Sequence, residues 1–182
     1  MKTDIRTVIL AGLFAALTAI GAFIRIPLGL IAITLQTFVT VMAGALLGAR
    51  WGMLSQVAYV LLGLVGLPIF LLGGGPGYVL QPSFGFLLGL IPCAWITGAL
   101  AGGSGQPGRI ILACVLGECA MYLVGVPYMY AICNLYLGKG LSLETVVTTG
   151  MLIYLPGDAI KIAVTALLAP AVNRSVSGLR TA

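Results

Sequence analysis

The sequence predicts an all-α integral membrane protein, and composition carries most of this prediction. Of its 182 residues, 60% are hydrophobic and 7% are charged, whereas soluble domains carry about 25% charged residues. The mean hydropathy is +1.16. The 26 glycines agree with this class, because small residues let membrane helices approach one another closely. We expect residues 1–182 to form a single membrane domain.

Six apolar segments are candidates for crossing a bilayer, which takes about 20 apolar residues per helix. The predicted spans are residues 7–24, 34–49, 51–70, 83–101, 109–135 and 157–172. The first is an unbroken apolar run, and a loop with Arg25, Pro27 and Gly29 follows it. A tight turn at residues 50–52 separates the second span from the third.

Glycine-rich segments separate the later spans. Residues 73–78 read GGGPGY and have no helix-forming character, and residues 102–108 read GGSGQPG and form a loop. Residues 138–140, GKG, end the fifth span, and residues 142–154 combine helix and loop. Pro156 suits the first turn of the last helix, where its missing N–H costs nothing.

The distribution of basic residues predicts the orientation of the chain in the membrane. An even number of spans places both termini on one side, and short cytoplasmic loops are enriched in Lys and Arg. With both termini cytoplasmic, the inner side carries six basic residues: Lys2, Arg6, Arg50, Arg109, Arg174 and Arg180. The outer side carries Arg25 and Lys139. The glycine-rich loop at residues 73–77 is therefore expected outside.

The start of the last span carries the most informative residues of the chain. Asp158 and Lys161 stand three positions apart in the segment LPGDAIK, so they share one face of a helix. Charged side chains at membrane depth are rare, and they usually face a bundle interior or a ligand. We expect the two to bind a small polar ligand. A mutual ion pair is the alternative interpretation, and a ligand can insert into such a pair.

Two segments supply further candidate residues for this site. Gln36 opens the second span and offers both a donor and an acceptor; an interfacial amide facing water is the alternative. The glycine loop is expected to form a lid or a plain turn, through Gly73, Gly74, Gly75 and Tyr78. It is not a phosphate loop, because it lacks the required glycine and lysine spacing.

The entry to the fourth span and two other features complete the candidates. Ser83 is a potential helix cap, while Phe84 and Phe86 are candidate walls for a flat ring or plain packing residues. A stripe of small residues on the first span, formed by Ala11, Ala15 and Ala19, would let another helix come close, in a partner or in the same bundle. Glu118, near the middle of the fifth span, is expected to be a structural carboxyl group, with proton coupling as the alternative.

Several kinds of function do not fit this sequence. The chain has no histidine, which argues against histidine-dependent catalytic triads and zinc-binding HExxH sites. Its four cysteines stand in apolar segments without a CxxC pair, so we expect no metal and no cofactor in this chain. The basic residues are scattered rather than clustered, which disfavours nucleic-acid binding.

Five segments of the chain carry a specific pattern: ITLQT at residues 33–37, AGALLG at 43–48, YVLLGLVGLPIF at 59–70, YLVGVP at 122–127 and LPGDAIK at 155–161. Taken together, these segments resemble the BioY family, the biotin-specific S components of energy-coupling factor (ECF) vitamin transporters. The segment PSFGFLLG at 82–89 is similar to a family segment in which Thr and Gly usually stand where this chain has Ser83 and Phe84. The resemblance covers nearly the whole chain in collinear order.

The resemblance implies a six-helix S-component fold in a prokaryotic cell membrane, with an outward-facing biotin pocket. It implies that Asp158 and Lys161 line that pocket. Independently of the resemblance, the thiolane ring and alkyl chain of biotin require apolar walls, and we expect these from Phe70, Phe84, Phe86 and Tyr122. The resemblance also implies that the alanine stripe docks on a transmembrane partner, EcfT. Two separate cytoplasmic ATPase subunits would hydrolyse ATP, so the chain itself is not expected to be an enzyme. In the family mechanism, the S component topples within the membrane and carries the ligand inward.

Other functions remain as alternatives. An S component for a different vitamin would keep the fold and change the pocket. A transporter that works without partners would use an ion gradient, with Glu118 and Asp158 as proton carriers. A small membrane enzyme is the least favoured, because the chain lacks a G-x-S-x-G nucleophile motif as well as histidine.

Overall fold

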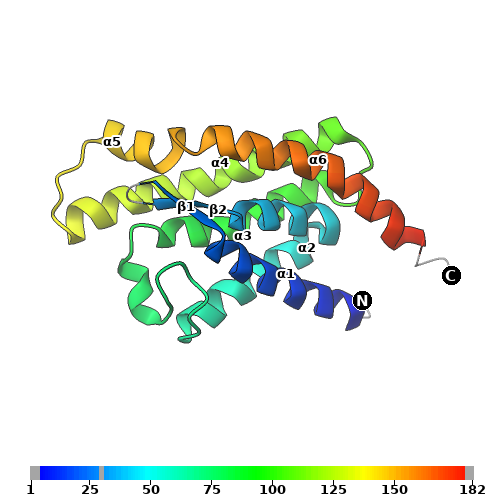
Figure 1. Ribbon diagram of the computed structural model, residues 1–182, viewed down its shortest axis with the longest axis horizontal. Coiled ribbons are helices and arrows are strands. Elements are labelled where there is room, and N and C mark those ends of the chain that lie inside the picture. Colours follow the sequence, from blue (N-terminus) through cyan, green and yellow to red (C-terminus); the bar gives the residue numbers. More distant parts are fainter. Residues whose placement is uncertain (1–4, 29–30, 179–182) are drawn as a thin grey trace.

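The structure is a bundle of long helices (Figure 1). The computed structural model describes residues 5–28 and 31–178, so Lys2 and Arg180 of the predicted inner side lie outside the described residues. The long helices are α1 (Ile5–Phe23), α2 (Gln36–Leu64), α3 (Phe84–Ala101), α4 (Pro107–Ala131) and α6 (Leu155–Gly178). Five helical stretches in the described ranges are long and apolar enough to cross a bilayer. The chain is therefore a multi-pass membrane protein.

A β-hairpin and several short helical turns connect the long helices. Strands β1 (Arg25–Leu28) and β2 (Ile31–Thr34) pair antiparallel, with Arg25 opposite Thr34. The loop predicted here is wrong: the segment forms a hairpin, and the isoleucine and threonine content of β2 favours a strand. The remaining elements are the 3₁₀ turn η1 (Pro76–Leu80), the π-helical turns η2 (Ile132–Tyr136) and η3 (Thr148–Leu152), and the short helix α5 (Leu143–Val147).

Helix α2 folds back on itself at Gly48. The backbone of Gly48 has φ 80° and ψ 176°, which is not helical. On either side of it, Gln36 Nε2 donates a hydrogen bond to Tyr59 Oη at 2.8 Å, and Thr40 Oγ1 donates one to Gln56 Oε1 at 3.1 Å. Positions 36 and 40 thus pair with 59 and 56, which requires two arms that run antiparallel. The predicted turn at residues 50–52 lies two residues further along the chain than the observed one.

The other predicted boundaries agree with the structure to different degrees. The span predicted at residues 83–101 corresponds closely to α3, which begins at Phe84. The span predicted to end at residue 70 instead ends at Leu64. Helix α6 begins before the predicted span 157–172 and extends beyond it. The first turn of α1 and the last turn of α6 lie toward the same end of the molecule (Figure 1).

Helix α3 packs between α2 and α4, and glycines allow the close approach. A Cβ atom at Gly98 of α3 would lie 2.4 Å from the backbone nitrogen of Ala49 in α2. On the other side of α3, a Cβ atom at Gly117 of α4 would lie 2.8 Å from the carbonyl oxygen of Cys93. Helix α1 packs against α2, and α6 packs against both α2 and α4. The core thus brings α2, α3, α4 and α6 around a common centre.

Gly48→Ala is expected to lower the free energy of unfolding by about 1–3 kcal/mol, because only glycine adopts this combination of φ and ψ without strain. A Cβ atom at Gly48 would meet no other atom within 4 Å, so the effect is conformational and not steric. Denaturant or thermal unfolding in detergent measures it. Gly105→Ala is the control, because Gly105 is exposed and also has no atom within 4 Å of a Cβ position. Equal stability of the two variants would contradict the prediction.

Candidate ligand-binding site

A pocket of about 640 Å³, measured with its open mouth, lies where β2, α2, α3, α4 and α6 meet. Its lining combines a few polar groups with apolar side chains. The lining residues are Ala32, Ile33, Thr34, Gln36, Thr37, Leu71, Tyr78, Ser83, Phe86, Leu87, Leu90, Met121, Tyr122, Gly150, Tyr154, Asp158 and Lys161.

At one end of the pocket, four side chains are joined by hydrogen bonds. We call this the charged end; its residues are Tyr122, Asp158, Lys161 and Thr37. Lys161 Nζ lies 3.0 Å from Asp158 Oδ1 and donates a hydrogen bond to Thr37 Oγ1 at 2.7 Å. The Tyr122 hydroxyl donates to Asp158 Oδ2. The prediction that Asp158 and Lys161 share a face is confirmed, and they also form the ion pair that was the alternative interpretation.

Local structure explains how α6 presents these two side chains. The backbone N–H of Asp158 donates to the carbonyl oxygen of Tyr154 at 3.0 Å, which closes the first turn of the helix. A carboxylate is favoured there by the helix dipole. The side chains of Asp158 and Lys161 are 4% and 11% exposed, so both charges are largely removed from solvent. A buried ion pair with unused acceptor positions suits a ligand that brings its own donors.

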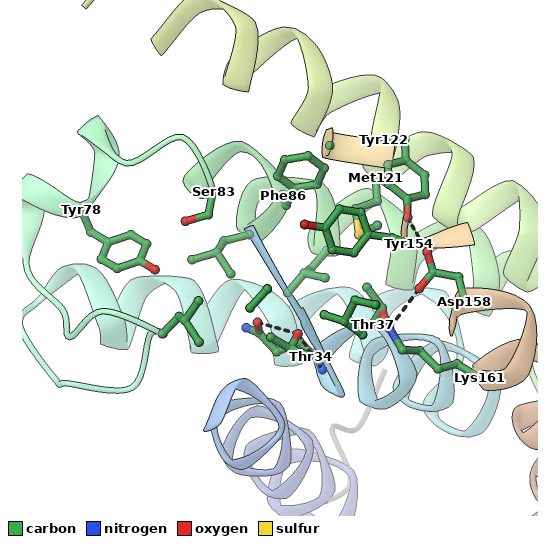
Figure 2. A pocket seen from close by; sticks show the side chains of 17 residues that line it. Thr34, Thr37, Tyr78, Ser83, Phe86, Met121, Tyr122, Tyr154, Asp158 and Lys161 are labelled. Carbon is green, nitrogen blue, oxygen red and sulfur yellow. Dashed lines mark hydrogen bonds and ion pairs between the residues drawn. The ribbon is translucent and has the colours of Figure 1, made fainter. Parts of the chain in front are cut away.

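The opposite end of the pocket carries the neutral polar groups of Tyr78 and Ser83, which we call the neutral end, and Thr34 lies between the two ends (Figure 2). Thr34 Oγ1 donates to Gln36 Oε1 at 3.1 Å, and the Gln36 amide donates to Tyr59. Figure 2 shows Tyr78 and Ser83 at one side of the pocket and Asp158 and Lys161 at the other, with Phe86, Met121 and Tyr154 between them. The site is therefore shaped for a ligand with polar groups at both ends and an apolar middle.

Two aromatic residues predicted as pocket walls do not line this pocket. Phe70 is fully buried and packs on Tyr59 and Tyr78, with ring centroids 5.4 and 4.6 Å apart. Phe84 is 4% exposed and packs between Tyr78 and Tyr128. Both rings thus support the Tyr78 side of the site from behind. Phe86 and Tyr122 do line the pocket, with centroids 6.3 Å apart.

The glycine segment predicted as a lid is bound to the end of α2. Gly73 and Gly75 have φ of 111° and 101°, and the Gly75 N–H donates to the carbonyl oxygen of Gly63 at 2.7 Å. A Cβ atom at Gly74 would lie 2.1 Å from the carbonyl oxygen of Leu67. These glycines do not line the pocket, whereas Tyr78 does. Their conformation sets the direction in which the chain returns toward the site.

The alanine stripe on α1 faces the interior of the bundle. Ala11 and Ala15 are 7% and 5% exposed, and Ala19 is partly buried against the core. The outward face of α1 carries larger apolar side chains, such as Leu13 and Ile20. This burial favours packing within the same bundle, the alternative to partner docking.

Some lining residues were not predicted from the sequence. Thr37 contacts Lys161 across 124 positions of the chain, and no local pattern signals such a contact. Tyr154 lies in the segment predicted only as part helix and part loop. Gly150, in the π-helical turn η3, opens space beside Phe86. The sequence does give one indication that Thr37 belongs to the site, because it stands in the polar segment TLQT beside Gln36.

Comparisons with known proteins give a consistent result. A family model described as "BioY family" matches residues 1–178. A protein of Lysinibacillus sphaericus, "Probable biotin transporter BioY", is 41% identical over 165 residues, covering 90% of this chain and 84% of that protein. "Biotin transporter BioY" of Thermotoga maritima is 34% identical, covering 90% and 94%.

A solved structure shares the fold. The crystal structure of "the S-component for biotin from an ECF-type ABC transporter" superposes with a TM-score of 0.82 at 24% identity, covering 96% of this chain and 95% of that chain. The similarity of fold extends over nearly the whole chain.

Proposed function

Because this chain belongs to the BioY family, as the match over residues 1–178 shows, we propose that it is a biotin-binding S component. It captures biotin on the outer side of a prokaryotic cell membrane and delivers it inward. As a member of a transporter family, the chain is a substrate-binding subunit and not an enzyme. The observation that carries the proposal is the charged end of the pocket, in which Tyr122, Asp158, Lys161 and Thr37 are joined by hydrogen bonds.

The chemistry of biotin complements the two ends of the pocket. Its ureido group has two N–H donors and one carbonyl, and its valerate tail ends in a carboxylate. In our proposal, Asp158 accepts from the ureido N–H groups and Lys161 donates to the ureido carbonyl. The carboxylate then meets the hydroxyl groups of Ser83 and Tyr78 at the neutral end. Phe86, Met121 and Tyr154 contact the apolar ring and chain between them.

Calorimetric titration of biotin into the purified chain in detergent tests this function. We expect 1:1 binding by the wild type. Lys161→Ala should weaken binding by 10-fold or more, about 1.4 kcal/mol, because the charged hydrogen bond to the ligand is lost.

Lys139→Ala is the matched control for this titration. It removes the same charge from an exposed loop, and we expect it to bind like the wild type. Failure of a folded wild-type chain to bind biotin, together with binding of another vitamin from a panel, would favour the alternative of an S component for a different substrate.

The membrane arrangement and the partners are part of the proposal. We count the two arms of α2 as separate spans, which gives six spans and places both termini in the cytoplasm. The transport complex then contains EcfT and two ATPase subunits. The fold shared with an ECF S component supports this assembly. Biotin uptake into vesicles that contain this chain alone, driven by a proton gradient, would favour a transporter that works without partners.

A further inference from the structure

Glu118 is a buried carboxyl group that the proposed biotin contacts do not use. It is 4% exposed, and it lies on α4 one helical turn before Tyr122. Its Oε1 atom is shielded and has no hydrogen-bond partner among the described residues. An ionised carboxylate without partners is costly to bury, so this group needs either a proton or a counter-charge.

The surroundings of Glu118 form the layer next to the pocket. The neighbouring Gly117 packs on the backbone of Cys93 in α3, one turn beyond the pocket residue Leu90. The titratable groups that interact electrostatically with Glu118 come from three helices: Cys93 of α3, Cys114 and Tyr122 of α4, and Asp158 and Lys161 of α6. Lys161 is the only cation among them, and it already pairs with Asp158 at 3.0 Å.

We propose that Glu118 is a proton-binding site whose occupancy is linked to occupancy of the adjacent pocket. When Glu118 is protonated, the negative charge of Asp158 and the positive charge of Lys161 balance each other. A ligand that fills the pocket displaces water and strengthens the repulsion between Asp158 and an ionised Glu118. The bound state therefore favours the protonated carboxyl group. It follows that binding takes up protons, and that affinity rises as the pH falls through the titration of Glu118.

The linkage is measured by calorimetry, and this step rests on biotin being the ligand. Titrations in two buffers with different ionisation enthalpies, from about pH 6 to 9, give the number of protons taken up. We expect the wild type to take up part of one proton, with an affinity change of at most about tenfold per pH unit.

The Glu118→Gln variant should still bind biotin, but it should not take up the protons that bind to Glu118 in the wild type. The difference in proton uptake between the wild type and Glu118→Gln identifies the contribution of Glu118. Glu144→Gln removes an exposed carboxylate and should behave like the wild type. Proton uptake by Glu118→Gln equal to that of the wild type would overturn the proposal, as would a wild type without any proton uptake.

Infrared spectroscopy tests the proton site without ligand. Near neutral pH, the difference spectrum between the wild type and Glu118→Gln should contain the carbonyl stretch of a protonated carboxylic acid. The difference spectrum between the wild type and Glu144→Gln should lack this band. If the wild type binds biotin but lacks this band, the proton site is wrong and the proposed function stands. If the band is present but biotin does not bind, the proposed function fails and the proton site stands.

Discussion

Asp158→Asn is expected to weaken biotin binding by about 10- to 150-fold. Hydrogen bonds to a charged group contribute about 1.5–3 kcal/mol, and about 1.4 kcal/mol corresponds to tenfold in affinity. The substitution keeps the shape of the side chain and an acceptor for Tyr122, but it removes the charge. Lys161 then loses its counter-charge in a buried position, so the free energy of unfolding should also fall, by about 3–5 kcal/mol. Calorimetry and denaturant unfolding measure the two effects.

A double variant separates the loss of binding from the loss of stability. Replacing both partners of a buried pair with groups of similar volume is often neutral for stability, so Asp158→Asn with Lys161→Met should recover much of the stability and none of the affinity. Glu144→Gln is the control for removal of a carboxylate far from the pocket. Wild-type affinity in Asp158→Asn would exclude Asp158 from the ligand contacts.

Gly98→Ala is expected to lower the free energy of unfolding by about 1–3 kcal/mol or more, the range for overpacked cores. The added Cβ atom would lie 2.4 Å from Ala49 N and from Gly48 C. Both are backbone atoms, so no rotation of a side chain relieves the clash, and α3 must move away from the turn of α2. Thermal unfolding in detergent measures the loss.

Gly12→Ala is the matched control for Gly98→Ala. Gly12 is also in a helix, and a Cβ atom there would meet nothing within 4 Å. Alanine is the better helix former by about 0.5–1 kcal/mol, so this variant should be unchanged or slightly stabilised. A Gly98→Ala variant as stable as Gly12→Ala would show that α2 and α3 are not in the close contact described here.

The membrane class, most helix positions and the pairing of Asp158 with Lys161 could be predicted because each depends on local sequence. Long apolar runs predict helices at membrane depth, and a spacing of three residues predicts a shared face. The β-hairpin and the bond between Thr37 and Lys161 depend on contacts between distant segments.

The direction in which apolar side chains point could not be predicted. A membrane helix is hydrophobic on all sides, so its sequence pattern does not distinguish an inward face from a lipid-facing one. For this reason Phe70 and Phe84 were expected at the pocket and pack behind it instead. The alanine stripe of α1 was open to two interpretations for the same reason. Glu118 could be placed at mid-membrane depth from sequence. That its Oε1 atom has no hydrogen-bond partner in the described part of the chain became visible only in the three-dimensional packing.

The ion pair at the start of α6 has a consequence for how the chain is built into the membrane. A single charged residue at the centre of an inserting helix costs about 2.5–3.5 kcal/mol. Asp158 and Lys161 lie 3.0 Å apart on the same helix, so the last segment carries its own counter-ion when it leaves the translocon. Thr37 and Tyr122 belong to helices synthesised earlier, and they supply the remaining hydrogen bonds on arrival. Only after this last insertion is the pocket complete, so truncated chains that end before α6 should enter the membrane without acquiring a binding site.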